Sequence, residues 1–463
     1  MFDKVFQRSD CLLNRRNRYV FLITLLTDLI AISHGISIGW FSPTLRKLQS
    51  PDSPVNFELT LNEISWVGSL VAMGSGITNI IFGLLLDRLG NRVCLLLLAF
   101  PNMCGWLLIY YAQSVEFLYA ARLLTGFSSG GMYIVNPIFI SEISNAKIRG
   151  SLSSMMMLFM NTGILIGYIL SSHIPYHIMP WIAIICPATY FLSMVFFVRE
   201  SPMYLIRKGK LKEAEESYCY YNNIRNNNKN ISDMAEFETM RIALTKSNEK
   251  EEAVTWKDFV TPAALKAYAI ATALVITNQF SCIFPLINFM STIFAQSGSQ
   301  MNPDTCTIIV GAVQLLGTYG TTLLCDICGR KLLLLVSTAG VAISLTAFGL
   351  FTHFAQIYDL SEWSWLPLVF MSSYIFLGNI GLIGCFVVCL VELFPYKIRS
   401  KATSAFIVSC SLIATFLLWV FPLCMEHWGI DVTMWSIAGI TGCGFCFLFV
   451  FLKETKGKSM LDD

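Results

Sequence analysis

The chain has 463 residues, of which 55% are hydrophobic and only 13% are charged, and its mean hydropathy is +0.61. Because about a quarter of the residues of a soluble domain are charged, this composition excludes an ordinary water-soluble protein. The formal net charge of +2 gives no sign of a nucleic acid partner, so we expect a protein whose main surroundings are a lipid bilayer.

Twelve apolar runs follow one another along the chain. A helix needs about 20 apolar residues to cross a bilayer core about 30 Å thick, and soluble cores do not contain a dozen such runs. The sequence therefore predicts an all-α membrane protein, in which Pro285 interrupts the seventh span. The predicted spans are 19–41, 64–86, 93–112, 117–141, 151–172, 180–198, 264–290, 304–325, 332–353, 365–391, 402–424 and 430–452.

The basic residues predict the orientation of these spans. If the N-terminus is cytosolic, only Arg46, Lys47 and Arg122 of the 32 Lys and Arg residues fall outside cytosolic segments. Cytosolic enrichment of Lys and Arg is the rule that orients membrane helices. We therefore expect an integral, multi-pass protein with both termini in the cytosol.

The segment 199–263 differs from the rest of the chain because it is charged and rich in Asn. It contains no glycine-rich loop that could hold a nucleotide phosphate. The chain thus divides into an N-terminal six-helix half (1–198), a cytosolic connector (199–263) and a C-terminal six-helix half with a cytosolic tail (264–463).

Both halves carry charged motifs at equivalent cytosolic turns, after their second, fourth and sixth spans. Parallel six-helix halves are a transporter architecture in which the solute site lies between the halves near the bilayer midplane. The matching pairs are Asp87-Arg-Leu-Gly-Asn-Arg92 with Asp326-Ile-Cys-Gly-Arg-Lys331, Glu142-Ile-Ser-Asn-Ala-Lys-Ile-Arg149 with Glu392-Leu-Phe-Pro-Tyr-Lys-Ile-Arg399, and Glu200-Ser with Glu454-Thr.

The acids and bases of these motifs are predicted to form a gate. Ion pairs between the halves form only when the cytosolic ends approach, so such pairs stabilise the outward-open state alone. The alternative is that these charges only set the topology or contact lipid headgroups. The predicted gate residues are Asp87, Arg88, Arg92, Arg122, Glu142, Arg149, Glu200, Asp326, Arg330, Glu392, Arg399 and Glu454.

Taken together, eight motifs resemble those of the sugar porter branch of the major facilitator superfamily, over essentially the whole chain. Asn161-Thr-Gly163 and Gly311-Ala-Val-Gln314 are more similar to its facilitative trehalose transporters than to its glucose facilitators. The eight motifs are Gly83-x-x-x-Asp87-Arg88-x-Gly90-x-Arg92, Arg122-x-x-x-Gly126, Pro137-x-Phe139-x-x-Glu142, Arg149-Gly150, Glu200-Ser201-Pro202, Gly329-Arg330-Lys331, Glu392-x-Phe394-Pro395 and Glu454-Thr455-Lys456-Gly457.

The resemblance implies the major facilitator fold, with twelve helices in two pseudo-symmetric halves. It also implies alternating-access transport of a saccharide or polyol, trehalose-like or hexose-like, by facilitated diffusion across the plasma membrane. The expected partners are this solute and the lipid bilayer. No enzyme activity, cofactor, metal or nucleic acid is expected, because no catalytic or metal-ligand constellation emerges; the oligomeric state is not predicted.

The substrate-facing motifs depart from the family pattern. Where the family has Gln-Gln-x-Ser-Gly-x-Asn and a Tyr pair in the seventh span, this chain has Asn278-Gln279-Phe-Ser-Cys-Ile-Phe284 and Asn288-Phe289. The tenth span lacks the family's prolines and Trp. Three lost contacts at about 1 kcal/mol each weaken an ordinary hexose site about a hundredfold, so the predicted site is divergent.

Five polar residues within the second half are the candidate solute ligands. Gln279 corresponds to a family sugar contact, whereas the others are polar residues on the seventh, eighth and tenth spans. For each, the alternative is a hydrogen bond between helices, worth about 0.6 kcal/mol on average. The candidates are Gln279, Asn278, Gln314, Asn288 and Asn379.

Two other functions remain open. A non-transporting sugar receptor is one, because the seventh span lacks the family's glycine and the tenth lacks its prolines, residues that allow gates to bend. A proton-coupled sugar symporter is the other, because Asp28 lies within the first span and a carboxyl there can titrate. The family's proton-coupling Asp corresponds to about Ser37 instead.

Overall fold

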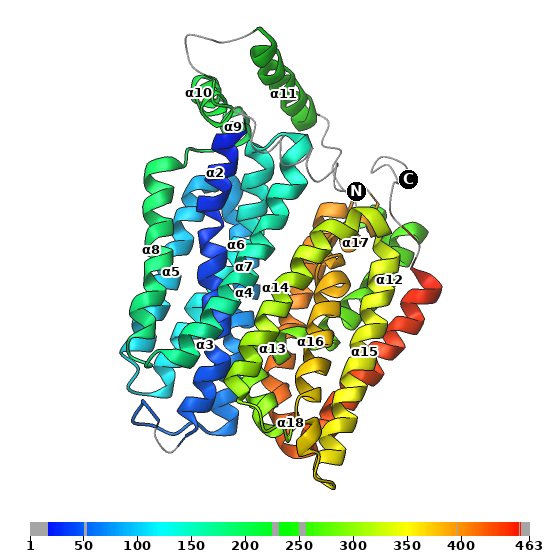
Figure 1. The fold of residues 1–463 in the computed structure, drawn as a ribbon. Helices are drawn as coiled ribbons and strands as arrows, with labels where there is room; N and C mark the ends of the chain where they lie inside the picture. The colour runs from blue at the N-terminus through cyan, green and yellow to red at the C-terminus, as the bar shows by residue number, and fades with distance from the viewer. Residues whose placement is uncertain are drawn as a thin grey trace.

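The computed structural model describes residues 17–50, 53–224, 231–249, 256–395, 397–452 and 454, and every regular element among them is a helix (Figure 1). Two bundles of long helices stand side by side, with a small helical connector above one of them. The N-terminal bundle consists of α2 (Arg18–Thr27), α3 (Leu29–Leu48), α4 (Leu61–Leu89), α5 (Asn91–Tyr110), α6 (Val115–Ile143), α7 (Ala146–His173) and α8 (Met179–Phe197).

The connector consists of α9 (Pro202–Arg207), α10 (Leu211–Tyr221), α11 (Ile231–Glu249) and the 3-10 turn η2 (Trp256–Val260). Leu205, Tyr218 and Phe237 hold α9, α10 and α11 together in a small apolar cluster of their own. We call the end of the molecule that carries α9–α11 the connector end, and the opposite end the far end.

The C-terminal bundle contains the remaining helices. These are α12 (Pro262–Phe280), α13 (Ile283–Gln296), α14 (Pro303–Cys328), α15 (Arg330–Ala355), the 3-10 turn η3 (Ser361–Trp363), α16 (Leu366–Gly378), the π-helical turn η4 (Asn379–Ile383), α17 (Phe386–Leu393) and α18 (Arg399–Phe451).

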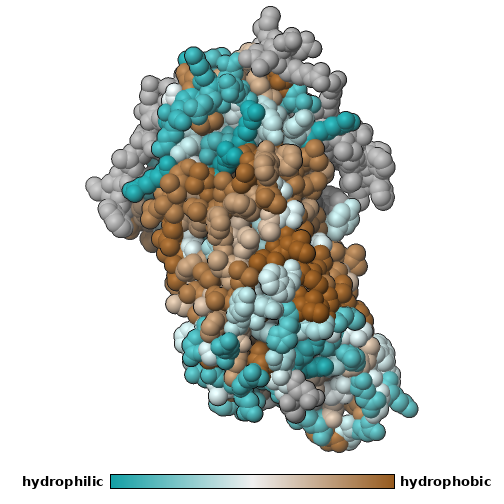
Figure 2. All heavy atoms as spheres, turned by 90° about the vertical axis from the view of Figure 1, so that its left-hand side faces the viewer, coloured by the Kyte–Doolittle hydropathy of each residue, from teal (hydrophilic) through white to brown (hydrophobic). Residues whose placement is uncertain are grey.

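Ten helical stretches of the described chain are long and apolar enough to cross a membrane. The last of them, Lys401–Phe451, holds two spans, because the chain turns at Gly429, where φ is +80°. The 26-residue helix α14 supplies one more, so the twelve predicted spans and the all-α membrane fold are confirmed. Figure 2 shows the result as a broad apolar band between two polar ends.

Aromatic side chains mark one edge of this band. Trp181, Tyr111, Tyr358, Trp363 and Trp365 are all exposed near the far end. Trp and Tyr concentrate where a membrane meets water, since their rings are apolar and their N–H or O–H groups are polar. The far end of the spans therefore lies at a membrane interface.

The first and fifth spans pack through glycines on both helices. A Cβ atom on Gly35 would lie 2.1 Å from a backbone oxygen of α7, and one on Gly163 would lie 2.2 Å from a backbone oxygen of α3. Gly39 and Gly167 continue this contact one turn further. Small residues four apart allow membrane helices to approach this closely, so α3 and α7 form a rigid pair.

The seventh span breaks between α12 and α13, as Pro285 predicts. Pro285 has no N–H to donate to the carbonyl of Ser281, one turn earlier, and that oxygen instead accepts a 2.7 Å hydrogen bond from the Tyr374 hydroxyl. The break itself falls at Cys282, whose φ of +56° lies in the left-handed region. Cys282 stands where the family motif has Gly, so the bend persists without the glycine.

The tenth span also bends, although it lacks the family's prolines. Its middle is the π-helical turn Asn379–Ile383 between α16 and α17. Gly381 allows this turn to lie against α15, because a Cβ atom there would be 2.4 Å from the carbonyl oxygen of Leu333. Both spans that the receptor hypothesis treated as unbent are therefore bent.

Candidate solute site and gates

The predicted solute ligands fall into three groups. Asn278 and Gln279 end α12 next to the bend of the tenth span. The Asn278 amide donates a 2.6 Å hydrogen bond to the Leu382 carbonyl, and Gln279 donates a 3.1 Å bond to the Asn278 side-chain oxygen. The two amides thus lie where the broken seventh and tenth spans meet.

A second group joins the two halves near the middle of α7 and α14. The Gln314 amide donates a 2.8 Å hydrogen bond to Asn161, and Asn161 donates a 2.6 Å bond to the Thr318 hydroxyl. The Thr318 hydroxyl in turn lies 3.4 Å from the Asn379 side-chain oxygen. We call Asn161, Gln314, Thr318 and Asn379 the central polar cluster; all four are buried.

Two members of this cluster, Thr318 and Asn161, are absent from the predicted ligands, and the more informative omission is Asn161. It belongs to the N-terminal half, whereas all the predicted solute ligands belong to the second half. A signal was present, because an Asn in the middle of an apolar span is costly unless it has a polar partner. Its bonds to Gln314 and Thr318 connect the two halves.

Asn288 lies apart from both groups, next to Arg122. Its side-chain oxygen accepts a 3.3 Å hydrogen bond from the Arg122 guanidinium. The same guanidinium donates to the carbonyls of Val67 at 3.0 Å and Ser37 at 2.9 Å, and it lies 4.7 Å from the centre of the Phe41 ring. Arg122 is 1% exposed, so a fully buried cation connects the halves through Asn288.

The prediction that Arg122 belongs to the cytosolic gate is wrong. The helix α6 begins at the far end with Val115, and Arg122 lies two turns later, whereas Glu142 is at the connector end of the same helix. Twenty residues of helix separate the two side chains by about 30 Å. Arg122 is part of the closure at the far end.

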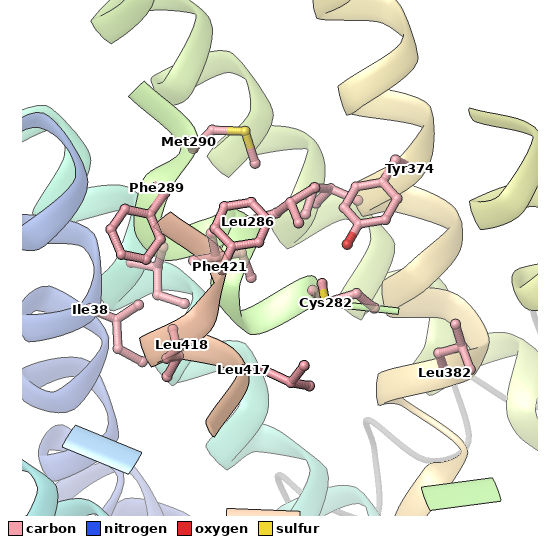
Figure 3. Close-up of a cluster of buried hydrophobic side chains, with 14 of the residues drawn as sticks. Ile38, Cys282, Leu286, Phe289, Met290, Tyr374, Leu382, Leu417, Leu418 and Phe421 are labelled. Atoms are coloured by element: carbon pink, nitrogen blue, oxygen red, sulfur yellow. The ribbon is translucent and has the colours of Figure 1, made fainter. Parts of the chain in front are cut away.

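The far end is closed by apolar and polar contacts between the halves. The ring of Phe289 packs against Phe41 with a centroid distance of 5.5 Å and against Phe421 at 5.7 Å (Figure 3). The backbone N–H of Ser291 donates a 2.9 Å hydrogen bond to the Ser42 hydroxyl. No water-filled path through such an apolar contact is expected, so solute cannot pass here in this state.

An ion pair reinforces this closure at the surface. Arg46 lies 3.6 Å from the Asp304 carboxylate, whose other oxygen accepts a 2.7 Å hydrogen bond from Ser291. Arg46 was one of the few basic residues predicted outside the cytosol. Because Arg46 is on α3 and Asp304 is on α14, the pair can exist only while the far ends of the two halves are together.

Replacing Asp304 with Asn should open the far end more often. The pair is partly exposed, and such pairs are worth about 1 kcal/mol, so we expect the ratio of far-end-open to far-end-closed protein to rise about fivefold. Spin labels on unnatural amino acids at the exposed positions Gln49 and Gln300 would measure the distance between the halves. Glu362→Gln, an exposed acid at the same end, is the matched control; an unchanged distance distribution in Asp304→Asn would contradict the assignment.

At the connector end, Glu142 contacts only its own half and the connector among the described residues. Its carboxylate accepts a 2.6 Å hydrogen bond from the Asn91 amide and another from the Ser201 hydroxyl, and it pairs with the Arg207 guanidinium. In the C-terminal half, Glu392 lies 3.6 Å from Arg330. Among the side chains that the structure describes, neither carboxylate has the partner across the halves that the gate hypothesis requires of the outward-open state, so that pairing stays a prediction.

Glu200, at the start of the connector, caps a helix of the N-terminal half, and Glu454 caps a helix of the C-terminal half. Glu200 accepts a 3.0 Å hydrogen bond from the backbone N–H of Asn91 at the start of α5, and Glu454 accepts one of 3.0 Å from the N–H of Arg330 at the start of α15. A carboxylate is favourable at a helix N-terminus, where N–H groups lack partners. Burial raises the pKa of the Glu200 carboxyl above its usual range, and these N–H donors oppose that shift.

The other predicted gate residues lie at the connector end without a described ion pair across the halves. Arg92 donates to the Val195 carbonyl at 3.0 Å, and Arg399 donates to the Phe394 carbonyl at 3.1 Å. The side chains of Asp87, Arg88 and Arg149 are exposed, while the side chain of Asp326 lies outside the described set. The described contacts between the halves thus run from the far end to near the middle of the spans.

Comparison with known proteins then identifies the family. The family model described as "Sugar (and other) transporter" matches residues 20–462, which is nearly the whole chain. The chain belongs to this sugar transporter family. The predicted family, the major facilitator fold, the multi-pass membrane location and a role in sugar transport rather than enzyme catalysis are confirmed.

Two members of the sugar transporter family are similar to this chain over most of their length. The chain is 29% identical to the facilitated trehalose transporter Tret1 of Bombyx mori, covering 95% of this chain and 86% of that one. The Tret1 of Apis mellifera ligustica is 28% identical with the same coverage. Among solved structures, the inward open conformation of the xylose transporter XylE from E. coli matches with a TM-score of 0.77 at 20% identity, covering 95% of this chain and 98% of that one. This last likeness concerns the fold.

Proposed function

We propose that this protein carries a saccharide or polyol by alternating access and facilitated diffusion. The observation that supports this best is the central polar cluster, in which Asn161 of one half bonds to Gln314 and Thr318 of the other. It lies near the middle of the spans, beyond a far end closed by Phe289 and Arg122. In this proposal, the described state exposes the site toward the connector end.

Amide and hydroxyl groups suit a sugar. Each Asn or Gln amide offers both donors and acceptors, and a sugar hydroxyl needs both. The hydrogen bonds from Gln314 to Asn161 and from Asn161 to Thr318 can therefore be exchanged for bonds to a solute as the halves separate. Because the two relatives reported above are trehalose transporters by name, trehalose is the first solute to test.

A transporter fits these bends better than a static receptor. The seventh and tenth spans lack the family's glycine and prolines, and a receptor would follow if these spans could not bend. Cys282 in its left-handed conformation and the π-helical turn at Asn379–Ile383 provide these bends by other means. π-Helical turns occur frequently at functional sites, and one here allows the tenth span to change shape.

Proton coupling is the second candidate, on the evidence of Asp28. Its carboxylate is buried, accepts a 2.7 Å hydrogen bond from Asn136, and has a second oxygen without a partner among the described residues. Such a group can take up a proton. Its distance along the first span from Ser37, the position of the family's coupling residue, favours uniport.

We further propose that the connector end faces the cytosol of a cell whose plasma membrane holds the protein. The start of α2 at Arg18 and the charged connector share this end (Figure 1). The excess of Lys and Arg there agrees with the orientation rule for membrane proteins.

Uptake by purified protein in proteoliposomes tests the proposed function. Labelled trehalose, hexoses and polyols would be offered with and without an imposed proton gradient. We expect saturable uptake of at least one of them that does not need the gradient. Uptake that depends on the gradient would favour the symporter, and no uptake by folded, correctly inserted protein would favour the receptor.

Substitution of the amides tests the site. Gln279→Ala and Gln314→Ala should each weaken binding of the transported sugar about fivefold, because each removes a hydrogen bond worth about 1 kcal/mol. Binding would be measured by calorimetry on purified protein. Thr346→Ala is the control, since the Thr346 hydroxyl bonds to its own helix on an exposed face. Wild-type affinity in both Gln variants would remove these residues from the site.

A further inference from the structure

The two halves build the same arrangement at the connector end, with one difference. The helices α5 and α15 each follow a glycine with positive φ, +87° at Gly90 and +88° at Gly329. The first residue of α5, Asn91, bonds to Glu142, and the first residue of α15, Arg330, pairs with Glu392. The repeat therefore aligns Asn91 with Arg330.

This alignment leaves the two carboxylates with different partners. Glu392 receives a cation from the helix start in its own half, whereas Asn91 offers Glu142 only a neutral amide. The Glu142 side chain is 8% exposed, and a carboxylate buried to this extent is unfavourable without an opposite charge. Among the described side chains, the cation that pairs with Glu142 is Arg207, which comes from the connector helix α9.

We propose that Arg207 is a positioning residue that supplies Glu142 with the charge that Arg330 supplies to Glu392. The pair of Arg207 with Glu142 couples the connector to the opening and closing of the predicted cytosolic gate. While Glu142 pairs with Arg207, it cannot pair with a basic residue of the other half. The pair therefore favours the state in which the two halves are apart at the connector end. The symmetric carboxylate Glu392 needs no such help from the connector.

The contacts of α9 agree with this role. The Tyr204 hydroxyl donates a 3.0 Å hydrogen bond to the Arg88 carbonyl, and the Ser201 hydroxyl donates to Glu142. Both contacts are with the N-terminal half, so they attach α9 to that half. Arg207 is 40% exposed, which leaves room for its side chain to release Glu142.

The test removes the Arg207 cation and then places an arginine at position 91, the first residue of α5, which is equivalent to Arg330. Arg207→Ala should lower the thermal unfolding midpoint of the full-length protein by about 2 °C. It should also raise the ratio of connector-end-closed to connector-end-open protein about fivefold. Spin labels on unnatural amino acids at Gly150 and Lys401, two exposed positions at the starts of the fifth and eleventh spans, measure that ratio. Adding Asn91→Arg to Arg207→Ala should restore both quantities, and Lys208→Ala should change neither.

The outcomes separate the pairing from its effect on the gate, which rests on the proposed alternating access. If Asn91→Arg rescues neither quantity, the proposal that Arg207 supplies Glu142 with the charge missing at position 91 is wrong. If it rescues the midpoint while the label distances never change, the pairing stands and its effect on the gate is overturned. If Arg207→Ala alone is recovered unfolded, rescue of folding by Asn91→Arg supports the proposal, and failure of both variants to fold overturns it.

Discussion

Replacing Arg122 with Leu should reduce sugar uptake at least about a hundredfold in folded, membrane-inserted protein. The change leaves three buried oxygens, on Val67, Ser37 and Asn288, without their donor. Each unsatisfied buried acceptor costs about 1–3 kcal/mol, so together they cost more than about 3 kcal/mol, a factor of more than about 100. Uptake into proteoliposomes of the sugar that the wild type carries is the measurement.

Two further variants show where this loss arises. Lys212→Leu, which removes an exposed cation of the connector, should leave uptake unchanged. Asn288→Ala removes the bond to Arg122 between the halves, together with a 2.9 Å bond from the Asn288 amide to the Phe284 carbonyl of its own helix. Labels at Gln49 and Gln300 should then report about fivefold more far-end-open protein. Near-normal uptake in Arg122→Leu would show that the buried cation has no role in closing the far end.

A single methyl group at Gly163 should destabilise the protein by about 3 kcal/mol, at the upper end of the usual cost of overpacking. The added Cβ would lie 2.2 Å from the backbone oxygen of Ile32. Neither backbone can move without separating α3 from α7. We expect Gly163→Ala to unfold at a clearly lower temperature and to lose most of its uptake.

Gly442→Ala is the matched control for this variant. Gly442 lies in α18, and an added Cβ there meets nothing within 4 Å. Because Ala is favoured over Gly in a helix by about 1 kcal/mol, this variant should be as stable as the wild type or more so. Equal stability of the two variants would contradict the close packing of the first and fifth spans.

The spans were predictable because their signal is local. An apolar run of about 20 residues forms a helix in a bilayer whatever its neighbours are. The break in the seventh span was also local, since Pro285 cannot donate to the Ser281 carbonyl. The bend at Asn379–Ile383 was not predictable in this way, because it depends on how closely Gly381 approaches α15.

The partners of the charged residues could not be derived from spacing along the chain. The repeat suggested that Glu142 and Glu392 act alike, yet within the described part of the chain only Glu142 pairs with a residue of the connector. Arg122 was assigned to the wrong end because a motif gives a residue's identity and not its depth. Asn161 was missed as a ligand because its partners, Gln314 and Thr318, belong to the other half.

Alternating access requires that the halves move apart at one end of the molecule as they come together at the other. Measuring the distance between the halves at both ends tests this most directly. One pair of labels, at Gly150 and Lys401, reports on the connector end, and the other, at Gln49 and Gln300, reports on the far end. Each would be measured in lipid with and without trehalose or another transported sugar. Alternating access predicts that sugar shortens one distance in the same fraction of molecules in which it lengthens the other. Distances that stay fixed, or that change in the same direction, would contradict it.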